Sequence, residues 1–278
     1  MIDRAGLAEF LRNRRESLQP EDVGMPRGQR RRTGGLRREE VAVLCHISTD
    51  YYARIERQRG PHPSEQMISS IAQGLHLTLD ERDHLFRLAG HTPPPRGSTS
   101  EHISPGLLRV LDRLDDTPAE IVTELGDTLR QSRLGVALTG DATRHTGHAR
   151  SRGYRWFTDP DERRLYVPED RALLSRSYAS GLRQVLGMRG PGSRAALLAG
   201  LLLERSEEFR ALWAEHEIGV RPDDVKRFDH PDVGALELHC QRLHDHQQSH
   251  SLLVYTAVPG TESHDKLQML AVLAPHVP

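Results

Sequence analysis

The sequence contains few cysteines, few aromatic residues and no long apolar run, and each absence excludes a class of protein. Cys45 and Cys240 are its only cysteines, too few for the disulfide framework of a small secreted domain, and they suit the reducing cytosol. Because no stretch of about 18 apolar residues occurs, we expect no membrane-spanning helix. The N-terminal residues also lack the apolar segment of a signal peptide. These absences predict a cytoplasmic protein, in which Cys45 fills a small buried apolar site.

The motifs of common catalytic and metal sites are missing as well. The chain has no Gly-rich phosphate loop, no Gly-x-Ser-x-Gly and no His-Glu-x-x-His. Possible metal ligands do gather in one short segment, which contains His239, Cys240, His244, His246 and His250. Their spacing matches no zinc site, and alternate residues of a strand point to opposite faces, so a solvated loop is favoured over a metal site. We therefore expect no enzyme, no metal and no cofactor.

The chain does contain enough apolar residues for packed cores. Its 278 residues, 36% of them hydrophobic, are sufficient for two domains. The formal net charge is only −1, but basic residues cluster near the N-terminus. The cluster contains Arg27, Arg30, Arg31, Arg32, Arg37 and Arg38. A local patch of this kind, rather than the charge of the whole chain, attracts phosphates, so nucleic acid is a candidate partner.

Apolar residues recur at helical spacing throughout residues 1–90. Helices are predicted for 7–18, for two short segments within 38–57, for 64–75 and for 78–89. Ser64 is a typical N-cap, and Thr78 forms a capping box with Glu81. The sequence thus predicts a five-helix, mainly α domain over 1–90, followed by a Pro-rich linker over 91–104.

Two of these helices are nearly adjacent in the sequence. Val41 and Cys45 lie one turn apart on the first helix, and Tyr52 and Ile55 lie close together on one face of the second. Ser48, between them, can accept a hydrogen bond from the first amides of the second helix. Two helices joined by so short a turn cross at a steep angle, which predicts a helix-turn-helix.

This pattern and the longer run LRREEV…STDYYARIERQRGPHPS resemble the N-terminal domain of MmyB-like transcription regulators. The Gly that is usual in the turn is His46 here, a residue type that tolerates positive φ. The resemblance implies that the second helix enters the major groove of double-stranded DNA, with Thr49, Asp50 and Arg54 facing the bases. Tyr51 could contact a thymine methyl group or a phosphate. The alternative is that Asp50 and Arg54 form an ion pair on a solvated face.

Further arginines complete the expected DNA-binding set. They are Arg57 and the clustered Arg30, Arg31, Arg32, Arg37 and Arg38. The loop over 19–35 corresponds to an insertion in the resembled family. It is expected either as an arm whose arginines contact phosphates or the minor groove, or as a disordered, solvated basic loop. The resemblance also implies a structural ion pair between Glu56 and either Arg14 or Arg15.

The segment 105–278 mixes strands and helices. Strands are predicted over 119–125, 128–132, 225–228, 234–240 and 252–258, and the Gly-Asp pair between the first two indicates a hairpin. Helices are predicted over 134–138, 169–186, 193–203, 206–216 and 262–273, and a loop over 143–153. We expect an α+β domain in which helices cover one side of an antiparallel sheet.

The runs YRWFTDPDERRLY, SEEFRALWAEHE, KRFDHPDVGALEL and LLVYTAVPGTES resemble the ligand-binding domain of MmyB-like regulators. The resemblance implies a PAS-like fold with an apolar pocket for a fatty-acid-like molecule. Arg155 matches an arginine thought to bind the carboxylate head; the alternative is an ion pair with Asp159 or Asp161. Ser132 stands where the family usually has Asn and can still donate one hydrogen bond. This departure leaves open whether the head-group site differs or the ligand is lost.

Trp156, Phe157, Leu212 and Trp213 are the remaining candidates for the pocket lining, although such side chains more often belong to the core. Taken together, these patterns predict a sequence-specific transcription regulator that binds a DNA operator as a homodimer and responds to a small apolar ligand. In the main alternative, the C-terminal domain only mediates dimerisation or protein–protein assembly. An enzyme with an attached DNA-binding domain is the other alternative, and only the His-rich segment supports it.

Overall fold

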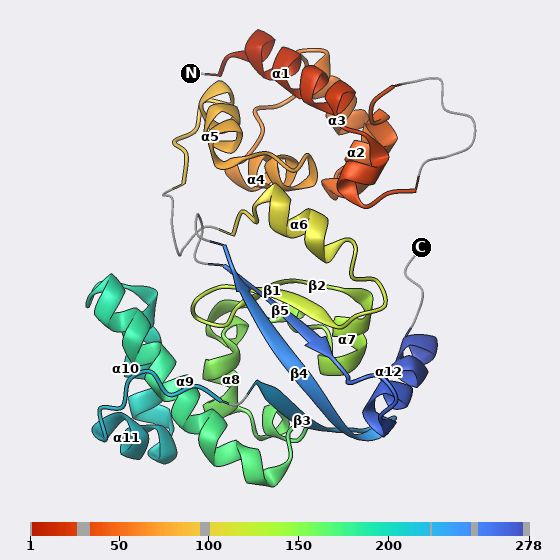
Figure 1. Ribbon diagram of the computed structural model, residues 1–278. Helices are drawn as coiled ribbons and strands as arrows, with labels where there is room; N and C mark the ends of the chain where they lie inside the picture. The colour runs from red at the N-terminus through yellow and green to blue at the C-terminus, as the bar shows by residue number, and fades with distance from the viewer. Residues whose placement is uncertain (1, 27–33, 95–100, 223, 246–249, 275–278) are drawn as a thin grey trace. The chain divides into compact units, whose positions relative to one another are not determined.

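The chain forms two compact units, Met1–Arg113 and Leu114–Pro278 (Figure 1). The computed structural model describes residues 2–26, 34–94, 101–222, 224–245 and 250–274. The predicted linker over 91–104 therefore falls within the first unit as the structure divides the chain, and one further helix follows it there.

The first unit is helical (Figure 1). Its helices are α1 (Arg4–Ser17), α2 (Arg38–Leu44), α3 (Thr49–Glu56), α4 (Glu65–Gly74), α5 (Leu79–Leu88) and α6 (Pro105–Leu111), with a 3-10 turn, η1, over Pro20–Val23. The first five match the predicted helices closely, and the mainly α fold class is confirmed.

Side-chain caps fix where these helices begin. Ser64 Oγ accepts from the amide of Met67 (3.3 Å) at the start of α4. At α5, Thr78 Oγ1 accepts from the amide of Glu81 (3.3 Å) while the Glu81 carboxylate accepts from the amide of Thr78 (2.8 Å). Each cap satisfies amides that have no partner inside the helix. The predicted helix starts at Ser64 and Thr78 are thus confirmed.

The second unit is an antiparallel sheet with helices, the α+β fold class that the sequence predicts. Its strands are β1 (Ala119–Val122), β2 (Thr128–Gln131), β3 (Val225–His230), β4 (Gly234–His244) and β5 (Ser251–Thr256), in the order β2-β1-β5-β4-β3. Its α-helices are α7 (Arg133–Thr139), α8 (Arg152–Thr158), α9 (Pro168–Arg189), α10 (Arg194–Arg205), α11 (Glu207–Ala214) and α12 (Glu262–Leu273). Short 3-10 turns, η2 (Ala142–Arg144), η3 (Gly147–Arg150) and η4 (Pro160–Arg163), connect α7 to α8 and α8 to α9.

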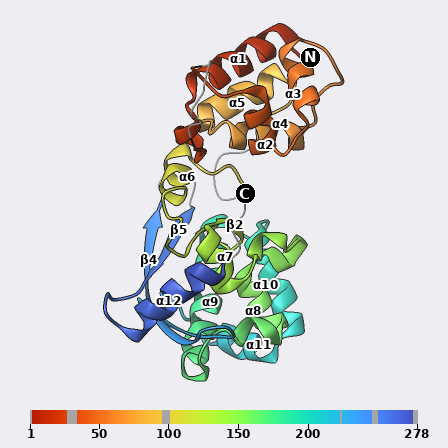
Figure 2. The ribbon, with the colours of Figure 1, turned by 90° about the vertical axis from the view of Figure 1, so that its right-hand side faces the viewer.

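Helices α8 to α11 lie on one face of this sheet (Figure 2). Burial alternates along parts of β3 and β4, so that Leu236 and Leu238 of β4 and Phe228 of β3 point into the core between the sheet and the helices, where they join Phe209 of α11. This layering explains the alternation in β4, because only one of its faces packs against the helices.

Two segments of this unit differ from their predictions. The loop predicted over 143–153 contains two 3-10 turns and runs directly into α8, which begins because Ser151 Oγ accepts from the amide of Tyr154 (3.3 Å). Helix α9 does not end at Gly187 but continues to Arg189. Gly190, with φ 79°, ends it instead, because glycine takes up a positive φ without steric cost.

Candidate DNA-binding surface and ligand pocket

The turn between α2 and α3 brings the two helices of the helix-turn-helix together. His46 follows α2 with φ 53°, in the left-handed region that the family's usual glycine would occupy without strain. Ser48 then caps α3, with its Oγ accepting from the amide of Tyr51 at 3.1 Å. Val41 and Tyr52 are fully buried where the two helices pack. The local geometry is therefore the one that the spacing predicts.

One face of α3 is exposed and polar. Thr49, Asp50, Arg54 and Arg57 are all exposed, and Asp50, Arg54 and Arg57 recur at helical spacing on the same side. Tyr51 is half-buried beside them. The opposite face is anchored in the core of the unit. The structure thus presents the predicted base-facing residues together on one accessible edge.

Arg54 and Asp50 form an ion pair one helical turn apart. Both side chains are more than half exposed, 52% and 72%. Exposed pairs of this kind contribute little to stability, because water solvates and screens both charges. The ion pair therefore aligns the Arg54 side chain along the helix and leaves its guanidinium accessible to a DNA base.

Glu56 joins α3 to α1 and to the start of α2. Its fully buried carboxylate accepts from Arg15 Nε (2.6 Å) and from Arg38 Nε (2.7 Å). Of the two arginines expected as its partner, Arg15 is confirmed, whereas Arg14 pairs with Glu81 at 3.1 Å. Burial alone would raise the pKa of Glu56, but the hydrogen bonds with the two arginines outweigh burial and lower the pKa.

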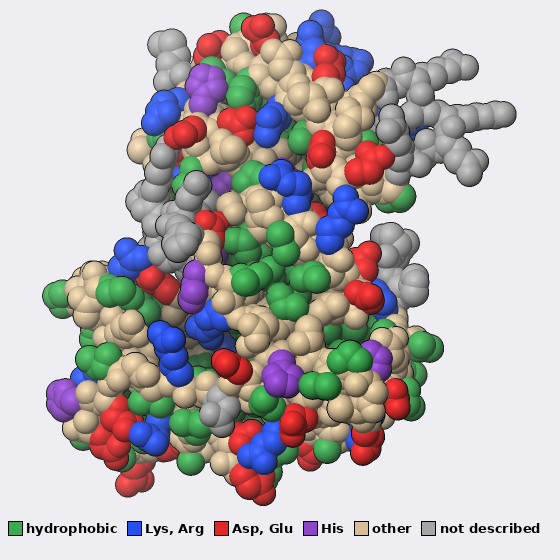
Figure 3. Space-filling view, in the orientation of Figure 1, with side chains coloured by type: hydrophobic (Ala, Val, Ile, Leu, Met, Phe, Trp, Pro, Cys, Tyr) green, Lys and Arg blue, Asp and Glu red, His purple; other side chains and the backbone are tan. Residues whose placement is uncertain are grey.

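The clustered arginines have different surroundings. Arg38 forms an ion pair with Glu56, but its side chain remains 41% exposed. Arg37 is exposed, and its ion pair with Glu39 is longer, at 3.4 Å. Arg30, Arg31 and Arg32 lie outside the described residues. Elsewhere on the N-terminal unit, Arg side chains alternate with Asp and Glu over the face seen in Figure 3. Any attraction for phosphates is thus local.

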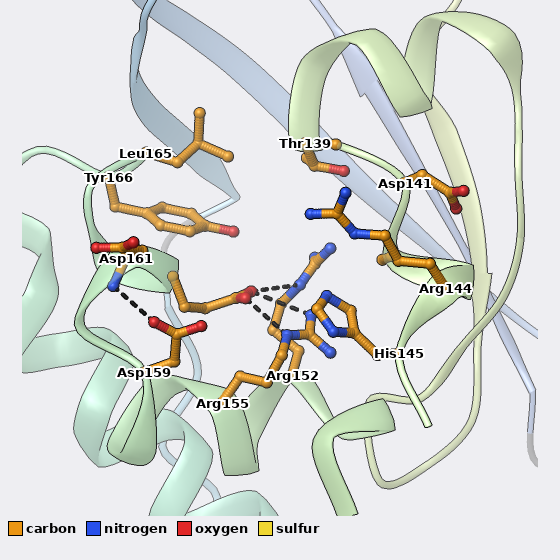
Figure 4. Close-up of a pocket in the computed structure, with 13 residues that line it drawn as sticks. Thr139, Asp141, Arg144, His145, Arg152, Arg155, Asp159, Asp161, Leu165 and Tyr166 are labelled. Atoms are coloured by element: carbon orange, nitrogen blue, oxygen red, sulfur yellow. Dashed lines mark hydrogen bonds and ion pairs between the residues drawn. The ribbon is translucent and has the colours of Figure 1, made fainter. Parts of the chain in front are cut away.

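The C-terminal unit contains a cavity of about 190 Å³ where α7, η2, α8 and η4 meet (Figure 4). Its lining is largely polar and includes Thr139, Asp141, Arg144, His145, Arg152, Arg155, Asp159, Asp161, Glu162, Leu165 and Tyr166. Of the predicted ligand-binding residues, Arg155 lines this cavity. The other predicted ligand-binding residues, Ser132, Trp156, Phe157, Leu212 and Trp213, do not line it.

Arg155 is buried, and its guanidinium makes four hydrogen bonds within the protein. Its Nε and Nη2 donate to the two carboxylate oxygens of Glu162 (2.7 and 3.2 Å), and Nη1 donates to the carbonyl oxygens of Ala149 (2.6 Å) and Arg150 (3.1 Å). The ion pair predicted with Asp159 or Asp161 is wrong. The 3-10 turn η4 folds the chain back, so Glu162 reaches the guanidinium instead.

Ser132 has an internal role in the fold. Its Oγ accepts from the amides of Gly135 (3.1 Å) and Ala119 (2.9 Å) and donates to the carbonyl of Thr117 (2.8 Å). The side chain therefore caps α7 and ties it to β1. Its hydrogen-bonding capacity is used within the protein.

The aromatic candidates pack in the core. Trp156 is buried, and its indole N–H donates to Ser175 Oγ (2.8 Å). Phe157 packs edge-on against Phe209, and Trp213 stacks on the same ring. Leu212 is a half-buried neighbour of this cluster. These contacts agree with the core alternative for all four candidates, and none of the four lines the cavity.

The cavity is also lined by polar residues that the sequence did not single out. Arg144 and Tyr166 point toward one another across it, and His145 lies beside Arg155 (Figure 4). Neither the Arg144 guanidinium nor the Tyr166 hydroxyl has a hydrogen-bond partner among the residues that the structure describes. Burial, then the charges of Arg155 and Arg144, lower the pKa of His145, which favours the neutral imidazole. No apolar periodicity marks the loops that contain these residues, so sequence patterns could not have identified them.

The cavity wall is held by a chain of alternating charges. Glu120 of β1 accepts from Arg152 Nη1 (2.7 Å), Arg152 Nε lies 3.3 Å from Glu162, and Glu162 pairs with Arg155. The hydroxyl of Tyr255 also donates to Glu120 (3.1 Å). Because the partners are buried and neutralise one another, the network fixes α8 and η4 against the sheet.

The described residues contain no group of three or more His, Cys, Asp or Glu side chains placed to hold a metal. His246 of the His-rich segment lies outside them. Among the described helices, none is both long and apolar enough to cross a membrane.

A helical unit with an exposed recognition-helix edge, followed by an α+β unit with a pocket, has the architecture of a DNA-binding regulator with a ligand-binding domain. The family model for the MmyB-like transcription regulator ligand binding domain matches residues 103–270, and one for a helix-turn-helix domain matches residues 7–85. The chain therefore belongs to the MmyB-like transcription regulators. No curated protein matches the chain.

Proposed function

We propose that this regulator binds a specific DNA operator through α3 and that a small ligand in the C-terminal unit controls the binding. The observation that carries the first part is the polar edge of α3, with Thr49, Asp50, Arg54 and Arg57 exposed together. An arginine at this position can donate two hydrogen bonds to guanine O6 and N7, and an aspartate can accept from cytosine N4. Arg37 and Arg38, at the start of α2, are proposed to contact phosphates.

Arg54→Ala tests this surface. We expect operator affinity to fall by about 1–3 kcal/mol and base preference to relax at one position, because a bidentate base contact is lost. Arg87→Ala, which removes an arginine from α5 and not from α3, is the matched control. Selected binding sites that keep the same base preference with Arg54→Ala would contradict the assignment of Arg54 to base contact.

We further propose that the protein acts as a homodimer. One recognition helix reads only a few base pairs, and two helices set one helical turn of DNA apart read a longer, symmetric site. Footprinting on selected sites should give two half-sites about 10 base pairs apart. A single asymmetric half-site would favour a monomer.

The ligand is proposed to be fatty-acid-like in kind, with an anionic head and an apolar part, as the family resemblance implies. The support is a cavity with two unpaired hydrogen-bond donors, Arg144 and Tyr166, next to an apolar side chain, Leu165. Native mass spectrometry of the purified protein, followed by organic extraction, should detect a bound carboxylic acid. The rival function is assembly alone; a chain that carries no ligand and whose DNA affinity is unchanged by added carboxylic acids would favour it.

A further inference from the structure

Tyr166 lies between two cavities of the C-terminal unit. On one side is the polar cavity of about 190 Å³ described above. On the other side is a second cavity of about 110 Å³ between α9 and β3, whose lining includes Leu173, Leu174, Pro222 and Val225. Tyr166 is the residue that lines both. Its side chain is therefore a wall between two spaces, each lined by both apolar and charged residues.

This wall is held in place on both its backbone and its ring. The backbone forms a β-bridge with Phe228 of β3, and the neighbouring carbonyl of Leu165 accepts from the amide of Asp229 (2.8 Å). The ring packs edge-on against Trp156 (5.5 Å between centroids) and lies 5.3 Å from the ring of Phe228. Only the hydroxyl is left to face the first cavity, where it points toward Arg144 (Figure 4).

The sizes of the two cavities decide what can bind. Sites for drug-sized ligands usually occupy about 300–1,000 Å³. The first cavity alone, at 190 Å³, is smaller than this range, whereas 190 and 110 Å³ together come to about 300 Å³. With the Tyr166 ring in place, the first cavity can enclose only a short alkyl chain of a ligand whose head lies near Arg144.

We propose that Tyr166 determines ligand specificity in two ways: its hydroxyl and Arg144 bind the carboxylate head of the ligand, and its ring limits the ligand to a short alkyl chain. The inference rests on the proposed ligand control and adds the chain-length limit. Arg155 is not assigned to the head, because Glu162 neutralises its charge and both N–H groups of Nη1 donate to carbonyl oxygens.

Calorimetry with the full chain and three probes tests the two roles separately. The probes are hexanoate, tetradecanoate and the uncharged analogue hexan-1-ol. The unmodified protein should bind hexanoate, and bind tetradecanoate and hexan-1-ol at least about tenfold more weakly, because one lacks room and the other lacks the charge that Arg144 recognises.

Two substitutions of the same residue separate the hydroxyl from the ring. Tyr166→Phe keeps the wall and removes one donor, so hexanoate affinity should fall about tenfold or more while tetradecanoate stays weak. Tyr166→Ala joins the two cavities, so the ratio of tetradecanoate to hexanoate affinity should rise by at least about tenfold. Tyr178→Ala is the matched control, since Tyr178 also packs on Trp156 (5.3 Å) but lines neither cavity.

Three outcomes would overturn the inference: tight tetradecanoate binding by the unmodified protein, an unchanged affinity ratio in Tyr166→Ala, or the same rise in Tyr178→Ala. Near-UV circular dichroism of each variant identifies a misfolded chain; in that case Tyr166→Leu, which removes the ring but keeps more of the packing, replaces Tyr166→Ala and should raise the same affinity ratio, though less. Failure of the proposed function is a different result: hexanoate binds as expected, but DNA affinity does not change.

Discussion

Glu56 is the residue on which the orientation of the recognition helix depends. Its buried carboxylate pairs with Arg15 of α1 and Arg38 of α2. In Glu56→Gln the two guanidinium groups lose their counter-charge, and breaking a buried pair in this way costs about 3–5 kcal/mol. We therefore expect faster hydrogen exchange of α1 and α3 amides in the full chain. Glu16→Gln is the control: Glu16 also pairs with Arg15 (3.0 Å) but is 57% exposed, so its loss should cost less than about 1 kcal/mol.

The same carboxylate gives the N-terminal helices a pH dependence. The folded-state pKa of Glu56 is lowered from its ordinary value. Its contribution to stability is therefore fully present above about pH 4.3, the ordinary Glu pKa, and is lost as pH falls through the lower folded-state pKa. Acid titration followed by hydrogen exchange of α3 should show this loss, and Glu56→Gln should flatten it. If stability falls equally with acid in the unmodified protein and in Glu56→Gln, other carboxylates cause the loss.

At the residue scale, the sequence identified charges but not all their partners. Arg15 was one of the two arginines that the family resemblance implied for Glu56, and the structure pairs it with that carboxylate. The partner predicted for Arg155 was wrong by one residue along the chain, because the 3-10 turn η4 determines which of the neighbouring carboxylates faces the guanidinium, and it presents Glu162. Arg144 and Tyr166 become neighbours only through the packing of η2 and η4, which no local pattern encodes.

The turn between α2 and α3 is strained at one position. His46 has φ 53°, where a side chain costs about 1 kcal/mol relative to glycine. His46→Gly should therefore stabilise the N-terminal helices by up to about 1 kcal/mol, and His46→Val should destabilise them because a β-branched residue tolerates this region least. Amide hydrogen exchange of α2 and α3 measures both changes. A loss of stability in His46→Gly would show that the imidazole makes a contribution that outweighs the strain.

At the element scale, caps and alternation were reliable predictors. The starts of α4 and α5 follow from their caps, Ser64 and Thr78, and β4 follows from Leu236 and Leu238, which alternate with polar residues. Helix α8 was missed because its apolar residues, Tyr154, Trp156 and Phe157, follow no clear helical stripe. All three are buried, so α8 is surrounded by protein and lacks the polar face that periodicity detects.

At the scale of the whole molecule, a net charge of −1 gives no general attraction for DNA. We therefore propose that the arginines of residues 27–38 supply the phosphate contacts. Replacing Arg30, Arg31 and Arg32 together by Gln should weaken binding to all DNA sequences alike. It should also make the slope of log affinity against log salt concentration shallower, by the equivalent of up to about three phosphate contacts. Affinities measured at several salt concentrations give the slope. If the slope does not change, these arginines make no phosphate contact.

Ligand and DNA are proposed to bind to different units of one chain, so their effects must be reciprocal. If hexanoate changes operator affinity by some factor, operator DNA changes hexanoate affinity by the same factor, because both describe one coupling free energy. Typical couplings of about 1–3 kcal/mol would give a factor of about 5–150. Operator titrations with and without hexanoate, and hexanoate titrations with and without operator, measure the two factors.

Tyr166→Phe should need more hexanoate to reach the same change in operator affinity, because its head-group contact is weaker while the two conformations remain unchanged. A factor of one in both directions, with hexanoate bound, would leave the pocket without a regulatory role and would favour assembly as the function of the C-terminal unit.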